Sequence, residues 1–217
     1  MKKKLLLGAM VAVVFGLYRA AYAQADSPKL EVGTQYSMMN LEGVPSQNTS
    51  SGFFSFGSAG WQHGFGGRII FSPASALGLE AELNLFPNGE YIRPLREGHS
   101  IQALFGVKAG KRSDRVGVFG KLRPGFMRFS KASDCPGENF MSCTIKEKTE
   151  LVVDIGGVFE FYPSRRCSLR VDIGDTMIRY GNFKVVNIGD DRGFPTVPFE
   201  GGTAHNLQVS FGVSYRF

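Results

Sequence analysis

The sequence predicts an all-β fold, an eight-stranded antiparallel up-and-down transmembrane β-barrel. Eight segments of the 217-residue chain alternate between apolar and polar residues, the period-two pattern of a strand with two unlike faces. The connections between these segments are alternately short and long, as in barrels that cross a membrane. A leader typical of exported proteins precedes them. Together these features predict a barrel with short turns at one end and long loops at the other.

Each predicted strand separates its residues onto two faces. The first places Leu30 and Val32 on one face and Glu31 on the other, and the last is apolar at every second residue from Leu207 to Phe217. In the fifth, Phe119 interrupts the alternation. A tilted transmembrane strand needs about 10 residues, and most of the segments have that length. The predicted strands cover residues 30–38, 61–71, 77–85, 101–110, 116–126, 151–161, 169–174 and 206–217.

The lengths of the connections orient the barrel. Short connections fall around residues 72–75, 112–115 and 163–166, and long ones near residues 40–60, 86–99, 130–148 and 181–204. In outer-membrane barrels short turns face the periplasm and long loops face the outside. We therefore expect both ends of the mature chain on the periplasmic side.

The N-terminus resembles a secretory signal peptide. Positively charged Lys2 to Lys4 precede an apolar stretch at residues 5–17, and Ala21-Tyr22-Ala23 is an A-x-A cleavage site, with Ala23-Gln24-Ala25 as a second candidate. The apolar stretch is shorter than the roughly 20 residues of a spanning helix, so an uncleaved anchor is the weaker alternative. We expect a signal peptide at 1–23, with cleavage after residue 25 as the other option, and one outer-membrane barrel domain at 24–217.

Composition and charge exclude several classes. A hydrophobic content of 43% excludes a disordered chain, and a mean hydropathy of −0.07 excludes a bundle of membrane helices. The formal charge of +6 includes four basic residues of the leader, Lys2, Lys3, Lys4 and Arg19, without which the charge is +2. The mature chain has no basic run, so we expect no nucleic-acid partner.

Glycine indicates which face points inward. It recurs on the charged face of the predicted strands, where an exposed outer surface would lose stability by having it. The lumen of an eight-stranded barrel is narrow and accommodates small residues beside a few long ones. We therefore predict that the polar face lines the lumen and the apolar face meets lipid. A soluble barrel of the lipocalin type, with the reverse arrangement, is the alternative.

The predicted lumen face carries equal numbers of basic and acidic side chains. Charges behind a low-dielectric wall persist only when they are paired, so the equality predicts a lumen filled by ion pairs. A charged pore lining is the alternative, although aqueous channels use about sixteen strands. The bases are Arg68, Lys108, Lys121, Arg123, Arg170 and Arg216, and the acids are Glu31, Glu80, Glu82, Asp154, Glu160 and Asp172.

Aromatic residues of the outward face lie towards the strand ends. Tyr36 and Trp61 are at the loop side of their strands, and Phe71, Phe161, Tyr215 and Phe217 are at the turn side. This distribution predicts two aromatic girdles at the membrane interfaces. The general preference of strands for aromatic residues is the alternative explanation.

The eight-strand pattern, ending in Val213-Ser214-Tyr215-Arg216-Phe217, resembles the small outer-membrane barrels related to the N-terminal domain of OmpA. The resemblance implies that the barrel assembly machinery recognises Val213, Tyr215 and Phe217, and that periplasmic chaperones and outer-membrane lipid are further partners. Larger members add a peptidoglycan-binding domain after the barrel. We expect a barrel without it, located in the outer membrane.

The sequence predicts no enzymatic activity, no cofactor and no metal site. The three histidines, His63, His99 and His205, all map towards the extracellular rim. A lipid hydrolase would need one of them as a base beside a serine nucleophile or a carboxylate that orients it, but the side chains of His99 and Ser100 face opposite sides of a strand. The histidines also lack the close spacing of metal ligands.

We therefore expect a non-enzymatic barrel with a structural role or a role in surface contact through its loops. Those loops contain the candidate adhesive residues Phe53, Phe54, Phe56, Asp190, Asp191 and Phe194, which are also typical of aromatic anchors and solvated turns. A narrow channel and a lipid-modifying enzyme are the alternatives.

The spacing of the cysteines predicts one disulfide bond. Cys135 and Cys143 share a long loop, and export places them in an oxidising compartment, whereas Cys167 lies near a turn on the opposite side of the membrane. We expect non-reduced peptide mapping to link Cys135 to Cys143. A bond from Cys167 to either would contradict the predicted strand topology.

Overall fold

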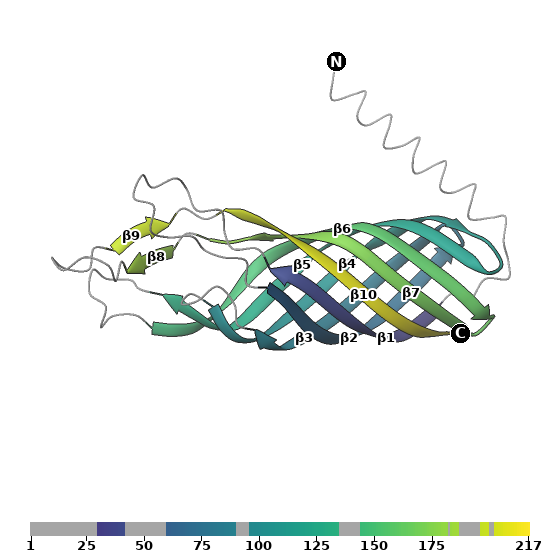
Figure 1. Cartoon of the computed structure of the whole chain (residues 1–217). Helices are drawn as coiled ribbons and strands as arrows, with labels where there is room; N and C mark the ends of the chain where they lie inside the picture. The colour runs from purple at the N-terminus through teal and green to yellow at the C-terminus, as the bar shows by residue number, and fades with distance from the viewer. Residues whose placement is uncertain are drawn as a thin grey trace, which may run out of the picture.

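The chain folds into a closed antiparallel barrel of eight strands, which confirms the predicted fold class (Figure 1). The computed structural model describes residues 30–41, 60–89, 96–134, 144–181, 183–186, 196–199 and 202–217. Nowhere in these ranges does a helix have the length and apolar character to cross a membrane. The barrel consists of β1 (Leu30–Leu41), β2 (Gly60–Ala74), β3 (Leu77–Gly89), β4 (Arg96–Arg112), β5 (Val116–Asp134), β6 (Thr144–Ser164), β7 (Cys167–Arg179) and β10 (Thr203–Arg216).

The first and last strands close the barrel. β1 pairs with β10 in antiparallel register from Glu31 opposite Arg216 to Met39 opposite Gln208. The backbone N–H of Phe217 donates a hydrogen bond of 2.8 Å to the carbonyl of Leu30. The strand order around the barrel is β1-β10-β7-β6-β5-β4-β3-β2, so each strand pairs with its neighbours in the up-and-down sequence.

A second, two-stranded sheet lies in the connection between β7 and β10. It pairs β8 (Phe183–Val186) with β9 (Thr196–Phe199). The sequence predicts a loop over residues 181–204, and this hairpin differs from that prediction. Its strands are four residues each and lack a long alternation of apolar and polar residues. The signal for strand is therefore weak.

The two ends of the barrel differ as predicted. β2 and β3 are joined by Ser75 and Ala76, β6 and β7 by Arg165 and Arg166, and β4 and β5 by residues 113–115. We call this the turn end, and Leu30 and Phe217 also lie there. We call the opposite end the loop end; β1 ends there at Leu41, and the labelled strands β8 and β9 lie beyond it (Figure 1).

β5 and β6 extend further towards the loop end than predicted. They have 19 and 21 residues and remain paired up to Asp134 opposite Thr144. Exposed charged residues such as Arg128 and Glu147 occupy this extension, where the apolar alternation that defined the predicted strands has ended. The backbone hydrogen bonds between the two strands continue without that pattern.

The outward face of the barrel is apolar, as predicted. Its large apolar side chains are between 39% and 68% exposed, which is where lipid contact is expected and where a soluble barrel would be polar. Phe119 is the exception that the sequence predicted, an apolar residue on the otherwise polar inner face, where it is 3% exposed. The apolar belt includes Val32, Phe65, Ile69, Leu79, Leu83, Phe105, Val118, Leu122, Leu151, Ile155, Phe159, Ile173, Phe211 and Val213.

Inward-facing glycines bring neighbouring strands and large lumen side chains close together. A Cβ at Gly106 would lie 2.1 Å from the carbonyl oxygen of Leu122 and 2.6 Å from the Cα of Arg123. A Cβ at Gly156 would lie 2.1 Å from the carbonyl oxygen of Ile173. Outward-facing Gly157 differs, because its nearest neighbour would be 4.0 Å away. The lumen positions therefore exclude any side chain, which explains why glycine marks the inner face.

Adjacent Gly156 and Gly157 provide a matched test of this packing. We expect Gly156→Ala to lower the free energy of unfolding by about 1–3 kcal/mol, because the backbone of β7 must move. Gly157→Ala should change it by less than about 0.5 kcal/mol. Urea titration in detergent micelles, followed by the heat-modifiable mobility of the folded barrel, measures both values. Equal effects of the two substitutions would contradict the assigned faces.

Candidate functional site

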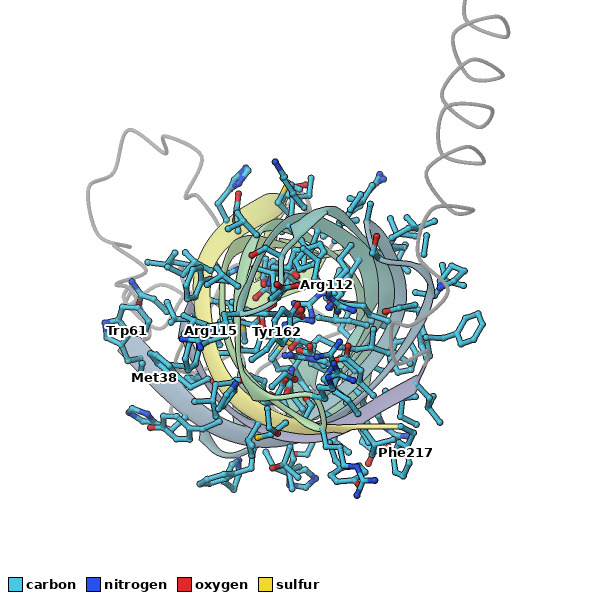
Figure 2. All side chains as sticks on the ribbon, turned by 90° about the vertical axis from the view of Figure 1, so that its right-hand side faces the viewer. Met38, Trp61, Arg112, Arg115, Tyr162 and Phe217 are labelled. Atoms are coloured by element: carbon cyan, nitrogen blue, oxygen red, sulfur yellow. The ribbon has the colours of Figure 1, made fainter. Side chains whose placement is uncertain are left out.

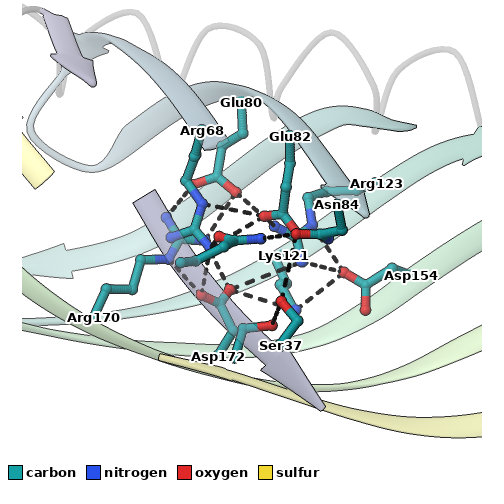
Figure 3. A network of polar contacts seen from close by, with 12 residues as sticks. Ser37, Arg68, Glu80, Glu82, Asn84, Lys121, Arg123, Asp154, Arg170 and Asp172 are labelled. Atoms are coloured by element: carbon teal, nitrogen blue, oxygen red, sulfur yellow. Dashed lines mark hydrogen bonds and ion pairs between the residues drawn. The ribbon is translucent and has the colours of Figure 1, made fainter. Parts of the chain in front are cut away.

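Arg123 of β5 occupies the centre of the charged lumen and is fully buried (Figure 3). Its Nη1 lies 2.5 Å from Glu82 Oε2 and 3.5 Å from Glu80 Oε2. Its Nη2 lies 2.6 Å from Asp154 Oδ2 and 3.9 Å from Asp172 Oδ1. The absence of a side chain at Gly106 on the neighbouring β4 provides the space that Arg123 needs. One guanidinium thus faces carboxylates from three strands, β3, β6 and β7.

Arg68 and Arg170 share the carboxylate of Asp172. Arg68 Nη2 lies 3.0 Å from Asp172 Oδ2 and 3.1 Å from Glu82 Oε2. Arg170 Nε donates to Asp172 Oδ2 at 2.7 Å, and its Nη2 donates to Glu80 Oε2 at 3.0 Å. Arg170 also lies 3.3 Å from Glu160. Each carboxylate here contacts more than one cation, which offsets the cost of its burial.

Two lysines belong to the same group of charged side chains. Lys108 pairs with Glu160 and lies 3.8 Å from Glu80. Lys121 Nζ lies 3.0 Å from Asp154 and 3.4 Å from Asp172. Ten of the twelve charged residues predicted for the lumen therefore belong to one connected cluster, which we call the lumen network; the other two, Glu31 and Arg216, lie at the turn end. Its members are Arg68, Glu80, Glu82, Lys108, Lys121, Arg123, Asp154, Glu160, Arg170 and Asp172.

At the turn end of the lumen the predicted residues Glu31 and Arg216 lie beside Arg112 and Tyr162, which were not predicted. Arg112 Nε donates to Tyr162 Oη at 2.8 Å, and its Nη2 lies 3.0 Å from Glu31. The guanidinium of Arg216 lies 4.5 Å from the ring centroid of Tyr162, and its Nε lies 3.3 Å from Glu31. Figure 2 shows Arg112 and Tyr162 inside the barrel when it is viewed from this end. Each lies two residues beyond an inward-facing residue of its strand, Gly110 for Arg112 and Glu160 for Tyr162. Extending the period-two alternation by one more step would therefore have predicted that both point into the lumen.

Arg112 adds a basic side chain to the six predicted for the lumen. Glu150 of β6 adds an acid that was also not predicted, because it is buried and shares the inward phase of Asp154. Arg112 was assigned to a turn because its strand was predicted to end at residue 110. In the structure β4 continues to Arg112, and the side chain reaches Glu31 and Glu160 across the lumen.

Uncharged polar side chains form a hydrogen-bonded chain across the lumen. Gln35 Nε2 donates to Asn84 Oδ1 at 2.6 Å, and Asn84 Nδ2 donates to Gln102 Oε1 at 2.9 Å. Gln102 Nε2 donates to Gln208 Oε1 at 3.0 Å, and Thr176 donates to the same oxygen at 2.8 Å. The chain connects residues of β1, β3, β4, β10 and β7. It therefore ties together strands that are not neighbours in the barrel wall.

Towards the loop end the inner face differs from the predicted polar face, because beside buried Gln62, Ser100 and Asn206 it carries a cluster of apolar residues. Each of these residues continues the inward phase of its strand, as Met39 and Leu41 follow Ser37 and Phe86 follows Asn84. All are at most 2% exposed. The cluster consists of Met39, Leu41, Phe86, Leu104, Met127, Phe129, Val152, Ile178, Tyr180 and Ala204. We call it the apolar plug.

The girdle residues lie on the outer face. Trp61 is 49% exposed near the loop end, and Tyr36 there packs against Phe65 with ring centroids 5.4 Å apart. At the turn end Tyr215 and Phe217 meet edge to face at 4.8 Å. Phe71 and Phe161 at this end are 46% and 41% exposed. Val213 shares the outward face of β10 with Tyr215 and Phe217.

The three histidines lie on the outer face or at the loop end. His63 Nδ1 is 2.5 Å from Tyr36 Oη, and His205 Nδ1 is 2.6 Å from Asp175 Oδ2. Exposed His99 and buried Ser100 face opposite sides of β4. In the described ranges no three His, Cys, Asp or Glu side chains are grouped to hold a metal ion.

Several predicted residues lie outside the part of the chain that the structure describes. These are Cys135 and Cys143 and the candidate adhesive residues Phe53, Phe54, Phe56, Asp190, Asp191 and Phe194. Among the described residues Cys167 is a free thiol, half-buried beside the β6–β7 turn.

The closed barrel, its apolar exterior and its filled lumen define the fold class of small eight-stranded outer-membrane β-barrels. Among solved structures the chain is similar to the outer membrane protein OprG from Pseudomonas aeruginosa, with a TM-score of 0.56, 8% identity and coverage of 88% of this chain and 97% of that one. Neisserial surface protein A (NspA) is similar with a TM-score of 0.51, 11% identity and coverage of 87% and 97%. At these identities the likeness concerns the fold. No family model and no curated protein matches the sequence.

Arg123 provides a test of the lumen network. We expect Arg123→Met to lower the free energy of unfolding by about 3 kcal/mol, because buried carboxylates lose their cation. The double variant Arg123→Met/Glu82→Gln should recover part of this loss. Arg128→Met is the control, because Arg128 pairs with Glu147 while both side chains are more than half exposed, and it should cost less than about 1 kcal/mol. Urea titration measures these variants together with the single variant Glu82→Gln, and strict additivity of the two single effects in the double variant would indicate a hydrated lumen.

Proposed function

We propose that the protein is an integral outer-membrane barrel with a sealed lumen and no enzymatic activity. Its role is structural, or one of surface contact through the connections at the loop end. The observation that supports this most directly is the filling of the lumen by side chains along its length. The turn end has Arg112 and Tyr162, the centre has the lumen network, and the loop end has the apolar plug.

An outer-membrane location is supported by three independent features. The outward face is an apolar belt with aromatic residues near both ends, such as Trp61 and Phe217. The N-terminal sequence is typical of a cleaved export signal. The fold is shared with solved outer-membrane barrels. In this location the loop end faces outward and the turn end faces the periplasm.

The sealed lumen distinguishes this proposal from a narrow channel. Arg123, Asp154 and Glu160 are 0% exposed, so ions would have to displace paired charges to pass. The apolar plug is a second barrier of different chemistry, because most of its buried side chains have no polar group that could replace the hydration of an ion. Transport through the barrel would therefore require both layers to rearrange.

Assembly in the cell is part of the same proposal. Val213, Tyr215 and Phe217 present an outward apolar series on the strand that closes the barrel against β1. We propose that the assembly machinery recognises this series and that periplasmic chaperones keep the unfolded chain soluble until then. The extracellular ligand of the loops, where one exists, is a further partner.

Conductance tests the sealed lumen. The purified barrel inserted into planar bilayers should show no stable conductance steps. The charge-balanced variant Lys108→Ala/Glu160→Ala should also remain closed, because it leaves the apolar plug in place. Steady, salt-dependent conductance of the unmodified protein would replace the proposal with a channel.

The pair of His205 and Asp175 favours a second candidate function, lipid hydrolysis. An imidazole held by a carboxylate at Nδ1 is the base of many hydrolases, and this pair is exposed on the outer face. Mass spectrometry of lipid A and phospholipids from cells that express the protein or its His205→Ala variant tests this function. A deacylated product that depends on His205 would replace the non-enzymatic proposal.

A further inference from the structure

Four exposed basic residues gather on one sector of the turn end. Lys111 lies at the end of β4 and Arg115 in the β4–β5 connection, and Arg165 and Arg166 form the β6–β7 turn. We call these four residues the basic arc. Asp114 is the one acidic residue among residues 111–115 and 163–167. Residues 72–76, which form the end of β2 and the β2–β3 turn, carry no charge. In the described part of the chain the exposed basic residues of the turn end therefore lie on one side of the barrel.

Backbone hydrogen bonds connect each of the two basic turns to the next strand around the barrel. The carbonyl of Arg115 accepts a bond of 2.9 Å from Tyr162 N, and the carbonyl of Arg166 accepts one of 2.9 Å from Arg216 N. Ser164 Oγ accepts a hydrogen bond from Arg166 N at 3.3 Å. The arc therefore extends along the rim from β4 through β6 and β7 to β10. Its backbone is fixed while its side chains are exposed.

The four side chains of the basic arc take no part in the ion pairs of the described lumen. Arg112 lies between Lys111 and Arg115 in sequence, but it points inward and pairs with Glu31 and Glu160. In contrast, within the described part of the chain none of the four arc residues has a carboxylate within 4.0 Å. They are consequently available to an external anion.

The basic arc lies where the apolar belt ends. Lys111 continues the outward series of Phe105, Val107 and Ala109 on β4, so it lies on the face that meets lipid. Phe161 is the last outward aromatic residue of β6 and is followed after a few residues by Arg165. A side chain at this level of a membrane barrel meets the polar headgroups of the lipid.

We propose that the basic arc binds the phosphate headgroups of anionic phospholipids in the leaflet that surrounds the turn end. The inference rests on the proposed membrane insertion and adds a lipid preference to it. Lipid fits better than a soluble acidic partner, because Lys111 projects sideways from the belt and aromatic residues flank the arc. A basic residue close to an anionic lipid surface contributes about fivefold in affinity at low salt, and added salt screens the effect.

Spin-labelled lipids test this proposal. The full-length protein is reconstituted in phosphatidylcholine vesicles with a trace of spin-labelled phosphatidylglycerol or phosphatidylcholine, and the motionally restricted fraction of each label is measured. We expect an at least about twofold preference for phosphatidylglycerol at low salt, and no preference at about 1 M salt, where the Debye length is about 3 Å. Arg165→Gln/Arg166→Gln should lower the preference, and the quadruple variant with Lys111→Gln/Arg115→Gln should lower it further.

Three control variants separate the arc from general charge and from misfolding. Arg165→Lys/Arg166→Lys keeps the charges and should keep the preference, and Asp114→Asn should raise it. Arg128→Gln/Arg179→Gln removes two basic residues at the loop end and should leave the arc-dependent preference unchanged. Heat-modifiable mobility verifies that each variant is folded.

The outcomes distinguish this inference from the proposed function. Failure of the unmodified protein to insert into vesicles would overturn the membrane proposal itself. Insertion without a lipid preference, or an equal loss of preference in the arc and loop-end variants, would overturn only the lipid site. Sedimentation with isolated peptidoglycan that depends on the arc, in the absence of a lipid preference, would assign the arc to the cell wall instead.

Discussion

A charge inside a narrow barrel can be neutralised only by another side chain of the same lumen, and much of this structure depends on that requirement. Arg123 illustrates it, because its guanidinium contacts carboxylates from β3, β6 and β7. Water, which would solvate such a group at a surface, has little room in a barrel of eight strands. The glycines next to the large side chains follow from the same requirement, since Gly106 leaves the space that Arg123 occupies. The large charged side chains can therefore pack inside the barrel only because glycines on the neighbouring strands leave room for them.

The sequence predicts the fold and the charged centre of the lumen because both depend on strand phase. A period-two alternation assigns every residue to one of two faces, and the inward position of Asp172 or Lys121 follows from its neighbours. The partners are not predictable in this way. Whether Asp172 contacts Arg68, Arg170 or Lys121 depends on strand tilt and rotamers, and the structure shows contacts with all three.

The missed residues have a common cause. Arg112, Tyr162 and Phe129 lie beyond the predicted ends of regular alternation, where both faces of a strand carry similar residues. At the loop end apolar side chains on the inner face, such as Phe129, cannot be distinguished by hydropathy from lipid-facing ones. Only the phase, counted onward from buried residues such as Arg123, assigns them to the lumen. The β8–β9 hairpin was not predicted for a different reason, because strands of four residues are too short to show the alternation of apolar and polar residues.

The hydrogen-bonded chain from Gln35 through Asn84, Gln102 and Gln208 to Thr176 has a consequence for the order of folding events. Its members come from the first, the middle and the last strands of the barrel, so it cannot form while the β1–β10 seam is open. The same holds for Glu31, whose partners Arg112 and Arg216 belong to β4 and β10. A half-closed sheet in lipid would therefore expose unpaired amides and charges to hydrocarbon. Closure of the seam and pairing of the interior must coincide, which makes insertion of this barrel an all-or-none event.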